Sequence, residues 1–587
     1  MRIRLDFPSS GTPFVFTDPV KVLRVTAYDQ VIPALEELEN WTRRGYWVAG
    51  FLSYEAAYGL VEAGKYAPYF STQSSLRELP LLGFGVFQEP TKMWDVGSSA
   101  AYSIGEWCLD PPMPRVEYDQ KIADIRQAIA RGLVYQVNFT LRLSSHFEGD
   151  PWSLYVMLRQ AQEASYTAYL EWDNHVILSL SPELLFAQKG SSLITRPMKG
   201  TAKRGRFYAE DMRYKEELEK SEKNRAENIM VADLFRNDLG RIARTGSVEV
   251  SSLCRAEAYP TVWQLTTEIR AETLQELPFS EVLKTLFPSG SITGAPKLSS
   301  MKIIRELESS PRGIYCGTLG YAAPFGQAEF NVAIRTVWID RTRQEAFFGT
   351  GGGITWDSTA GDEYDELLTK SRFLTRRQQA VSLLETMKLD QGRYWLKSYH
   401  LARLEESAVY YRIPFDSATL QERLRNIEDR CPSGLWRVRI TVDGSGRISS
   451  QVLPLTRLSP GVQPVLWAEE PIFSDDPLFF HKTTCRDFYN RVHPAQSESF
   501  DHLLWNKHGE VTEFTRGNLV IRYRGALLTP TRESGLLAGT FRSLLLERGI
   551  IREERIGPGM VEDCEQMWFI NSLYGWVPVI LHGSLAP

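Results

Sequence analysis

The chain has 587 residues, which is too many for a single hydrophobic core and predicts about three or four units of domain size. A net charge of −5 and an isoelectric point near 6.0 argue against a broad basic face for nucleic acid. No apolar run reaches the roughly 18 residues that a membrane-spanning helix needs, so we expect neither a nucleic-acid nor a membrane partner.

The cysteines and the first residues indicate the compartment. The six cysteines are scattered without a CxxC pair, which is typical of free thiols in a reducing cytoplasm rather than of disulfides or a zinc site. The segment from Met1 to Pro8 lacks the apolar core of a signal peptide. A cytoplasmic location is therefore expected.

The first 190 residues predict an α+β arrangement. Apolar spacing predicts helices over 32–41 and 118–131. Strands are predicted over 45–54, 134–143, 165–172, 176–180 and 184–188. Because so few helices separate the strands, antiparallel sheets are favoured over a parallel βαβ series.

A basic stretch, residues 195–205, follows an apolar run. Pro197 and Gly200 fix the backbone on either side of Lys199, so that lysine can be aimed inward. A basic surface loop is the simpler interpretation of this stretch alone. On either interpretation, Lys203 and Arg204 are expected to remain ordinary surface charges.

Three later segments offer polar groups to a ligand. A long helix over 213–244 carries Glu227 where its polar and apolar sides meet. Residues 287–297 place Ser, Thr and Gly before a helix, an arrangement that suits an anion or a plain capped loop. Glu363 and Glu366 share one face of a helix that begins near residue 362. Acidic residues of this kind are commonly solvated, yet two carboxylate-bearing helices also permit a magnesium site.

The polar run at 375–379 is the best candidate for a domain junction. We therefore expect one domain over 1–375, a linker over 376–380 and a second domain over 381–587. The second part predicts a strand at 381–387, a helix at 400–411, a hairpin of 436–443 with 447–454, and a helix from 540 to 547.

Residues 1–375 resemble the chorismate-utilising enzyme family, which includes anthranilate, isochorismate, salicylate and aminodeoxychorismate synthases. The resemblance rests on motifs that recur in order, at residues 135–138, 181–183, 197–201, 225–241, 290–297 and 351–366. It implies a sandwich of antiparallel sheets with outer helices, and a deep cleft in which Mg²⁺ joins protein carboxylates to chorismate.

The resemblance also implies roles for individual residues. Glu227 and Glu366 are the implied magnesium ligands, with Glu363 acting through water. Glu183 is the implied general acid. The substrate-contacting positions are Ser291, Tyr321, Arg335 and Gly352.

Lys199 separates the members of this family. Aminodeoxychorismate synthases carry a lysine here as the expected nucleophile, whereas anthranilate synthases carry alanine. Gln136 replaces the water-activating lysine of isochorismate and salicylate synthases, and Gln264 replaces the histidine of the anthranilate type. The resemblance therefore implies amination of chorismate at C4 through a covalent Lys199 adduct.

Residues from about 380 to 587 resemble the fold-type IV pyridoxal-phosphate enzymes, which include aminodeoxychorismate lyase and several aminotransferases. The resemblance implies a two-subdomain fold that binds pyridoxal 5′-phosphate. Lys482 is the implied cofactor-bearing catalytic lysine. The other implied cofactor-binding residues are Arg403, Glu513, Asn518, Thr540 and Ser572. Each would be an ordinary surface residue if it stood alone.

Together the two resemblances imply 4-aminobenzoate synthesis by a synthase fused to a lyase. No glutaminase segment is visible, so a separate glutamine amidotransferase is the expected source of ammonia. A homodimer through the second half is a further expected partner. Three alternatives stay open: an anthranilate-type synthase with an aminotransferase appendage, an aminotransferase in place of the lyase, and a non-catalytic chorismate-binding regulator.

Overall fold

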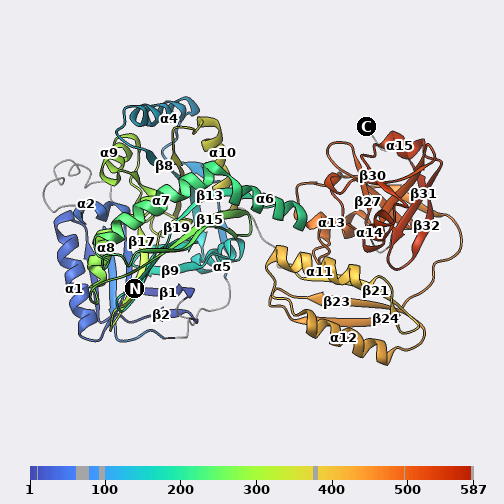
Figure 1. Ribbon diagram of the computed structural model, residues 1–587, viewed down its shortest axis with the longest axis horizontal. Coiled ribbons are helices and arrows are strands. Elements are labelled where there is room, and N and C mark those ends of the chain that lie inside the picture. Colours follow the sequence, from blue (N-terminus) through green and yellow to red (C-terminus); the bar gives the residue numbers. More distant parts are fainter. Residues whose placement is uncertain (9–10, 61–78, 92–99, 375–380, 495, 584–587) are drawn as a thin grey trace. The chain divides into compact units, whose positions relative to one another are not determined.

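A computed structural model describes residues 1–587 except 9–10, 61–78, 92–99, 375–380, 495 and 584–587 (Figure 1). The chain divides into two compact units, residues 1–203 with 215–378 and residues 204–214 with 379–587. The second unit thus includes a short segment that the expected division at 375–381 assigns to the first. The predicted linker, 376–380, lies outside the described residues.

The strands of the first unit form two large sheets whose pairings are antiparallel throughout. The first sheet runs in the order β16 (Gly294–Ala295), β8 (Gln136–Gly149), β20 (Glu345–Ile354), β19 (Thr336–Asp340), β10 (His175–Ser181), β9 (Tyr166–Trp172), β1 (Arg2–Asp6) and β2 (Phe14–Phe16), with β6 (Tyr102–Ile104) and β7 (Cys108–Leu109) paired to β8. The second runs β13 (Met198–Lys203), β15 (Val262–Glu272), β12 (Ser192–Arg196), β11 (Leu184–Lys189), β18 (Gln327–Asn331), β17 (Thr318–Ala323), β4 (Trp47–Leu52), β5 (Leu82–Phe87) and β3 (Lys21–Val25), with β14 (Glu249–Ala258) paired to β15.

The two sheets pack against each other through an apolar layer. Ile3, Leu170 and Ile177 of the first sheet meet Phe51 and Leu319 of the second, and all five are fully buried. Helices cover the outer faces and the end of the sandwich. They are α1 (Val31–Arg43), α2 (Ala57–Leu60), α4 (Arg115–Ala130), α5 (Pro151–Gln162), α7 (Glu222–Gly240), α8 (Phe279–Leu286), α9 (Lys297–Leu307) and α10 (Ala360–Ser371). The helix α6 (Tyr208–Lys220) begins in the segment 204–214 of the second unit and ends in the first unit. The predicted antiparallel sandwich with outer helices is confirmed.

The prediction of one long helix over 213–244 is wrong in one respect, because the structure has two helices in this region. α6 ends at Lys220 and α7 begins at Glu222. Ser221 has an extended backbone, and its side chain accepts a hydrogen bond from the amide of Asn224, which caps α7. Charged residues continue on both sides of Ser221, so the sequence pattern did not indicate that one helix ends and another begins there.

The second unit contains two sheets. An antiparallel sheet has the order β22 (Arg393–Tyr394), β21 (Leu383–Asp390), β23 (Leu435–Val442) and β24 (Ile448–Pro454). A mixed sheet has the order β27 (Val511–Phe514), β26 (Asp501–Trp505), β25 (Gln463–Trp467), β32 (Gly575–His582), β31 (Gln566–Asn571), β28 (Asn518–Tyr523), β29 (Ala526–Pro530) and β30 (Arg552–Glu554). The helices are α11 (Lys397–Tyr411), α12 (Ser417–Arg430), α13 (Asp487–Val492), α14 (Thr540–Glu547) and α15 (Pro558–Glu562). The two sheets form the two expected subdomains.

The segment 204–214 is anchored inside the second unit, so the expectation of a surface charge at Arg204 is wrong. Two nitrogens of its guanidinium donate to the carboxylate of Asp211 at 2.8 and 2.7 Å, and one also donates to the carbonyl of Tyr410 at 2.8 Å. Only 6% of the Arg204 side chain and none of the Asp211 side chain is exposed. Phe207 of the same segment stacks on Phe480.

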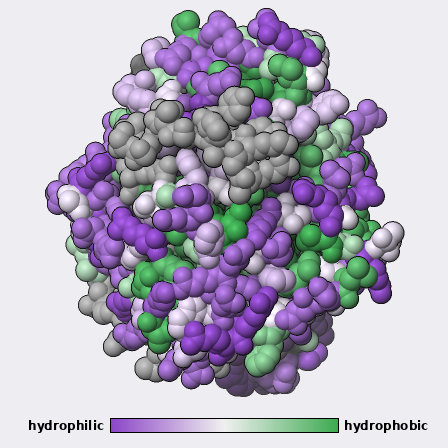
Figure 2. Space-filling model, turned by 90° about the vertical axis from the view of Figure 1, so that its left-hand side faces the viewer, coloured by the Kyte–Doolittle hydropathy of each residue, from purple (hydrophilic) through white to green (hydrophobic). Residues whose placement is uncertain are grey.

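Figure 2 shows one face of the molecule, on which hydrophilic residues predominate and hydrophobic ones form small separate groups. Among the described residues, no helix has the length and apolar character needed to cross a bilayer.

Candidate active sites

A cavity of about 370 Å³ in the first unit brings most of the predicted residues together. Strands of both sheets and the helices α7 and α10 contribute to its wall. The predicted residues that line it are Glu183, Lys199, Glu227, Ser291, Arg335, Glu363 and Glu366. Residues separated by more than 180 positions in the sequence therefore share one site.

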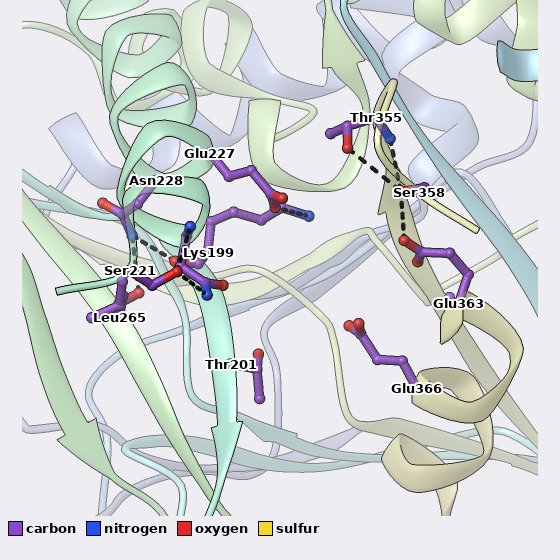
Figure 3. Close-up of polar contacts among 12 residues, drawn as sticks. Lys199, Thr201, Ser221, Glu227, Asn228, Leu265, Thr355, Ser358, Glu363 and Glu366 are labelled. Carbon is purple, nitrogen blue, oxygen red and sulfur yellow. Dashed lines mark hydrogen bonds and ion pairs between the residues drawn. The ribbon is translucent and has the colours of Figure 1, made fainter. Parts of the chain in front are cut away.

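Lys199 is aimed into this cavity by a local irregularity of β13. The register between β13 and β15 shifts between Met198 and Thr201, and Gly200 has a φ of 97°, which favours glycine. The Nζ atom of Lys199 lies 3.7 Å from Oε2 of Glu227 on α7 (Figure 3). The interpretation of this stretch as a mere basic loop does not fit this placement.

Glu183 has the character of a buried acid. Its side chain is 2% exposed, and Oε1 accepts a hydrogen bond of 2.5 Å from the Ser291 hydroxyl. Burial raises the pKa of Glu183 to about 8, although the Ser291 hydrogen bond and the charge of Lys199 act in the opposite direction. The carboxyl group is therefore protonated near neutral pH and can donate a proton.

Three carboxylates lie on opposite sides of the cavity. Figure 3 shows Glu227 on α7, with Glu363 and Glu366 facing it from α10. Each has a polar partner: Glu227 pairs with Lys199, Glu366 with Lys370 at 2.6 Å, and Glu363 accepts from Ser358 at 2.6 Å.

These carboxylates suit Mg²⁺ in chemistry, because that ion prefers oxygen ligands and typically uses one or two carboxylates plus substrate oxygens. Within the described ranges, no three His, Cys, Asp or Glu side chains lie close enough together to enclose an ion. Glu227 and Glu366 are paired with Lys199 and Lys370 instead.

The glycine-rich end of β20 leaves room beside these groups. A Cβ atom on Gly352 would lie 2.8 Å from Oε2 of Glu363, and one on Gly353 would lie 2.5 Å from Nζ of Lys199. The same position on Gly353 lies 2.7 Å from the amide nitrogen of Gln136, whose side chain is 1% exposed and whose two polar atoms have no hydrogen-bond partner within the described part of the chain. A side chain on this strand would therefore obstruct the lysine.

Tyr321 does not line the cavity, so this prediction of a substrate contact is not supported by the structure. Its ring is fully buried between the two sheets, where it contacts Phe14 and Trp47. The tyrosine that lines the cavity is Tyr315, in the turn before β17. A Cβ atom on Gly349 would lie 2.1 Å from the Tyr315 ring, so glycine at 349 makes space for it. The glycine at position 349, on the strand that leads into residues 351–353, is therefore the feature of the sequence that could have indicated Tyr315 as a residue of the cavity.

A second site lies in the second unit, in a cavity of about 80 Å³. All six residues predicted to bind the second cofactor line it, namely Arg403, Lys482, Glu513, Asn518, Thr540 and Ser572. They come from α11, the loop before α13, β27, β28, α14 and the turn after β31.

Two titratable groups with shifted pKa values line this second cavity. Burial, together with the charges of Arg403 and Arg486, lowers the pKa of Lys482 to about 8. Burial raises the pKa of Glu513 to about 8, and the hydroxyl of Tyr489 donates to its Oε1 at 3.0 Å. Lys482 therefore gives up its proton far more readily than an ordinary lysine, and a fraction of it is the free amine near neutral pH.

The second cavity also offers side-chain and backbone groups of the kind that pyridoxal phosphate needs. A Cβ atom on Gly539 would lie 2.1 Å from Oδ1 of Asn518, so the backbone before α14 needs a glycine. Thr540 stands at the N-terminus of that helix, where a phosphate is favoured. Arg403 lies on the same wall, although its guanidinium is held in a bidentate pair with Glu385 at 2.8 Å.

Comparison with known protein families agrees with these two sites. Residues 106–376 match the family of chorismate binding enzymes, and residues 382–581 match amino-transferase class IV. The chain joins a chorismate-binding domain to a class IV aminotransferase domain. Both resemblances expected from the sequence are thereby confirmed.

Relatives with different reaction names resemble the chain almost equally. It is 38% identical over 275 residues to aminodeoxychorismate synthase component 1 of Bacillus subtilis, an alignment that covers 47% of this chain and 58% of that protein. It is 39% identical over 261 residues to anthranilate synthase component 1 of Aquifex aeolicus, covering 44% and 52%. The chain thus spans little more than half the length of these relatives.

A solved structure supports the fold of the chorismate-binding domain. Anthranilate synthase component I from Streptococcus pneumoniae TIGR4 superposes with a TM-score of 0.52 at 23% identity, covering 64% of this chain and 92% of that one. Overall sequence identity is almost the same to aminodeoxychorismate synthases and to anthranilate synthases. The choice between these two reactions must therefore rest on the residues of the site.

Proposed function

We propose that the chorismate-binding domain aminates chorismate at C4 to give 4-amino-4-deoxychorismate, and that the class IV domain then eliminates pyruvate to give 4-aminobenzoate. The observation that carries this proposal is the position of Lys199, in one cavity with Glu183, Glu227 and Glu366. Gln264 lines the same cavity and bonds to Thr201 at 3.0 Å, at the position where the anthranilate type has histidine.

In the first step, the Lys199 amine attacks ring carbon C2 of chorismate, and the C4 hydroxyl leaves with a proton from Glu183 as water. Ammonia then adds at C4, and the bond from C2 to the lysine nitrogen breaks. The sum is chorismate plus ammonia giving 4-amino-4-deoxychorismate plus water. Nucleophilic and acid catalysis of this kind need a free amine and a protonated carboxyl group near the same ring.

The other residues hold the substrate. Bound Mg²⁺ would be held by Glu227 and Glu366, with Glu363 beside them, and would neutralise a carboxylate of chorismate. Arg335 is a second cation for such a carboxylate, although burial lowers its pKa to about 10. Ser291 positions Glu183 through their hydrogen bond. Ammonia would come from a separate glutamine amidotransferase subunit.

In the class IV domain, Lys482 as the free amine would take the proton from C4 of aminodeoxychorismate. The bond between C3 and the enolpyruvyl oxygen then breaks, pyruvate leaves, and the ring becomes aromatic. Bound pyridoxal phosphate supplies the electron sink for this elimination. Glu513 would face its ring nitrogen, and Arg403 and Thr540 would hold its phosphate.

Incubation of the full chain with chorismate, Mg²⁺, ammonium and pyridoxal phosphate tests the proposal. The expected products are 4-aminobenzoate and pyruvate, resolved by mass and fluorescence. Anthranilate would contradict the assignment of the first domain. Aminodeoxychorismate that accumulates without pyruvate would contradict the lyase assignment and favour an aminotransferase.

A further inference from the structure

The cofactor cavity of the second unit opens into a larger cavity of about 630 Å³. The two cavities share Lys482, Arg486 and Tyr489 among their lining residues. A molecule that reacts at Lys482 would therefore extend into the larger space.

The larger cavity is strongly cationic. Arg437, Arg439, Lys482, Arg486 and Arg516 line it, and no aspartate or glutamate is among the described residues of its wall. Such a cavity attracts an anion, because its walls concentrate one sign of charge.

Two of these arginines are already engaged in the protein. The guanidinium of Arg516 pairs with the buried carboxylate of Asp501 at 3.1 Å and also donates to the carbonyl of Phe500. Arg486 donates to the carbonyl of Thr515 at 2.7 Å. Their remaining capacity to bind a substrate is correspondingly limited.

Arg437 and Arg439 differ from them. Neither side chain has a hydrogen bond or an ion pair in the part of the chain that the structure describes, and both residues are exposed. They alternate along β23 with Val438 and Ile440, which are fully buried in the core beneath α11 and α12. Because side chains alternate between the two faces of a strand, both arginines point away from that core and toward the cavity.

Their neighbours on the sheet add no negative charge. Arg437 stands opposite Lys388 and Leu453, and Arg439 stands opposite Thr386 and Gln451. The cross-strand neighbour of Arg437 is therefore a like charge and not a carboxylate, and the ammonium of Lys388 lies over the Trp395 ring at 4.1 Å from its centroid. The backbone of this sheet also reaches the reactive lysine, since the amide of Leu384 donates to the carbonyl of Lys482 at 2.9 Å.

We propose that Arg437 and Arg439 form a carboxylate-binding subsite that selects a dicarboxylate substrate for the second site. This inference rests on the proposed function. Aminodeoxychorismate carries a ring carboxylate at C1, at the opposite end of the ring from its C4 amine, and a second carboxylate on the enolpyruvyl group. With the amine at Lys482, these carboxylates extend into the arginine-lined cavity.

The test uses the full chain loaded with pyridoxal phosphate and compares Arg437→Gln, Arg439→Gln and the double variant with wild type. Each single variant should raise the KM for aminodeoxychorismate about tenfold, and the double variant about a hundredfold, because each loses a hydrogen bond to a charged group. The cofactor absorbance should remain. Arg425→Gln is the matched control, since Arg425 is exposed on α12 and lines neither cavity.

A second readout does not depend on turnover. Isophthalate, a dianion without an amine, should perturb the absorbance of the bound cofactor in wild type and in Arg425→Gln, with about tenfold weaker affinity in each arginine variant. Rising ionic strength should weaken its binding to wild type.

The outcomes separate the two proposals. If wild type does not convert aminodeoxychorismate, the proposed function fails, whereas isophthalate binding that depends on Arg437 and Arg439 still supports the subsite. If wild type converts it and the variants keep KM and isophthalate affinity within about twofold, the subsite is refuted. A change in oligomeric state with unchanged KM would also refute it and assign the arginines to an interface between copies.

Discussion

The Nζ atom of Lys199 lies 3.7 Å from Oε2 of Glu227, so the expected nucleophile and an expected magnesium ligand are paired with each other. In this pair each group is held by the other rather than by a substrate or an ion. On the proposed mechanism, Mg²⁺ held by Glu227 would separate this pair and leave Lys199 facing the substrate.

The proposed nucleophilic role of Lys199 predicts that Lys199→Ala abolishes amination of chorismate, since alanine has no amine to attack the ring. Product formation from chorismate and ammonium measures this. Lys203→Ala is the control, because Lys203 is exposed on the same strand and should retain wild-type turnover. Undiminished amination in Lys199→Ala would refute the nucleophilic role.

Glu183 predicts a specific pH dependence. Its pKa is raised to about 8, so the protonated acid is present below that pH and is lost as pH rises through it. The amination rate should therefore fall above about pH 8. Glu183→Gln should lower kcat by about 10²- to 10⁴-fold at neutral pH and remove this alkaline limb.

Ser291→Ala gives a finer test of the same carboxyl group. The Ser291 hydrogen bond lowers the pKa of Glu183, so its removal should move the alkaline limb to higher pH. A pH–rate profile measures the shift. If the alkaline limb of the pH–rate profile is the same in Ser291→Ala and in Glu183→Gln as in wild type, Glu183 is not the titrating acid.

Much of this site could be predicted because its chemistry is concentrated in local motifs. Lys199, Glu227 and Glu366 each lie in a distinctive short segment, and folding brings these segments together. The structure places Tyr315, and not Tyr321, in the wall of the cavity. The sequence alone cannot tell whether a tyrosine in a buried strand or one in the preceding turn contacts the substrate, because that depends on the packing at Gly349. The burial of Arg204 could not be predicted because its partners, Asp211 and Tyr410, are 7 and 206 residues away in the sequence, and charge alone does not reveal burial.

The Arg204–Asp211 pair predicts a large effect on stability. Arg204→Ala leaves the Asp211 carboxylate buried without its partner and should lower the free energy of unfolding of the second unit by about 3–5 kcal/mol. Urea unfolding followed by the absorbance of the bound cofactor measures this. The exposed pair Lys220–Glu216 is the control, and Lys220→Ala should change stability by less than about 1 kcal/mol. Equal effects of the two substitutions would contradict the anchoring role of residues 204–214.

Lys482→Ala should separate the two activities. The variant should lose the absorbance of the covalently held cofactor and should release aminodeoxychorismate instead of 4-aminobenzoate, because the first cavity is intact. Lys507→Ala, at an exposed position beyond β26, should keep both properties. Formation of 4-aminobenzoate at the wild-type rate by Lys482→Ala would exclude this lysine from the elimination.

The central claim, that Lys199 bonds covalently to the substrate ring, can be measured directly. The full chain is incubated with chorismate and Mg²⁺ without ammonia and is then digested. The mass of the peptide that contains Lys199 is measured by mass spectrometry. The account predicts a mass increase equal to chorismate less one water on Lys199, which disappears when ammonium is added. An unmodified Lys199 peptide, from protein that aminates chorismate once ammonium is supplied, would contradict it.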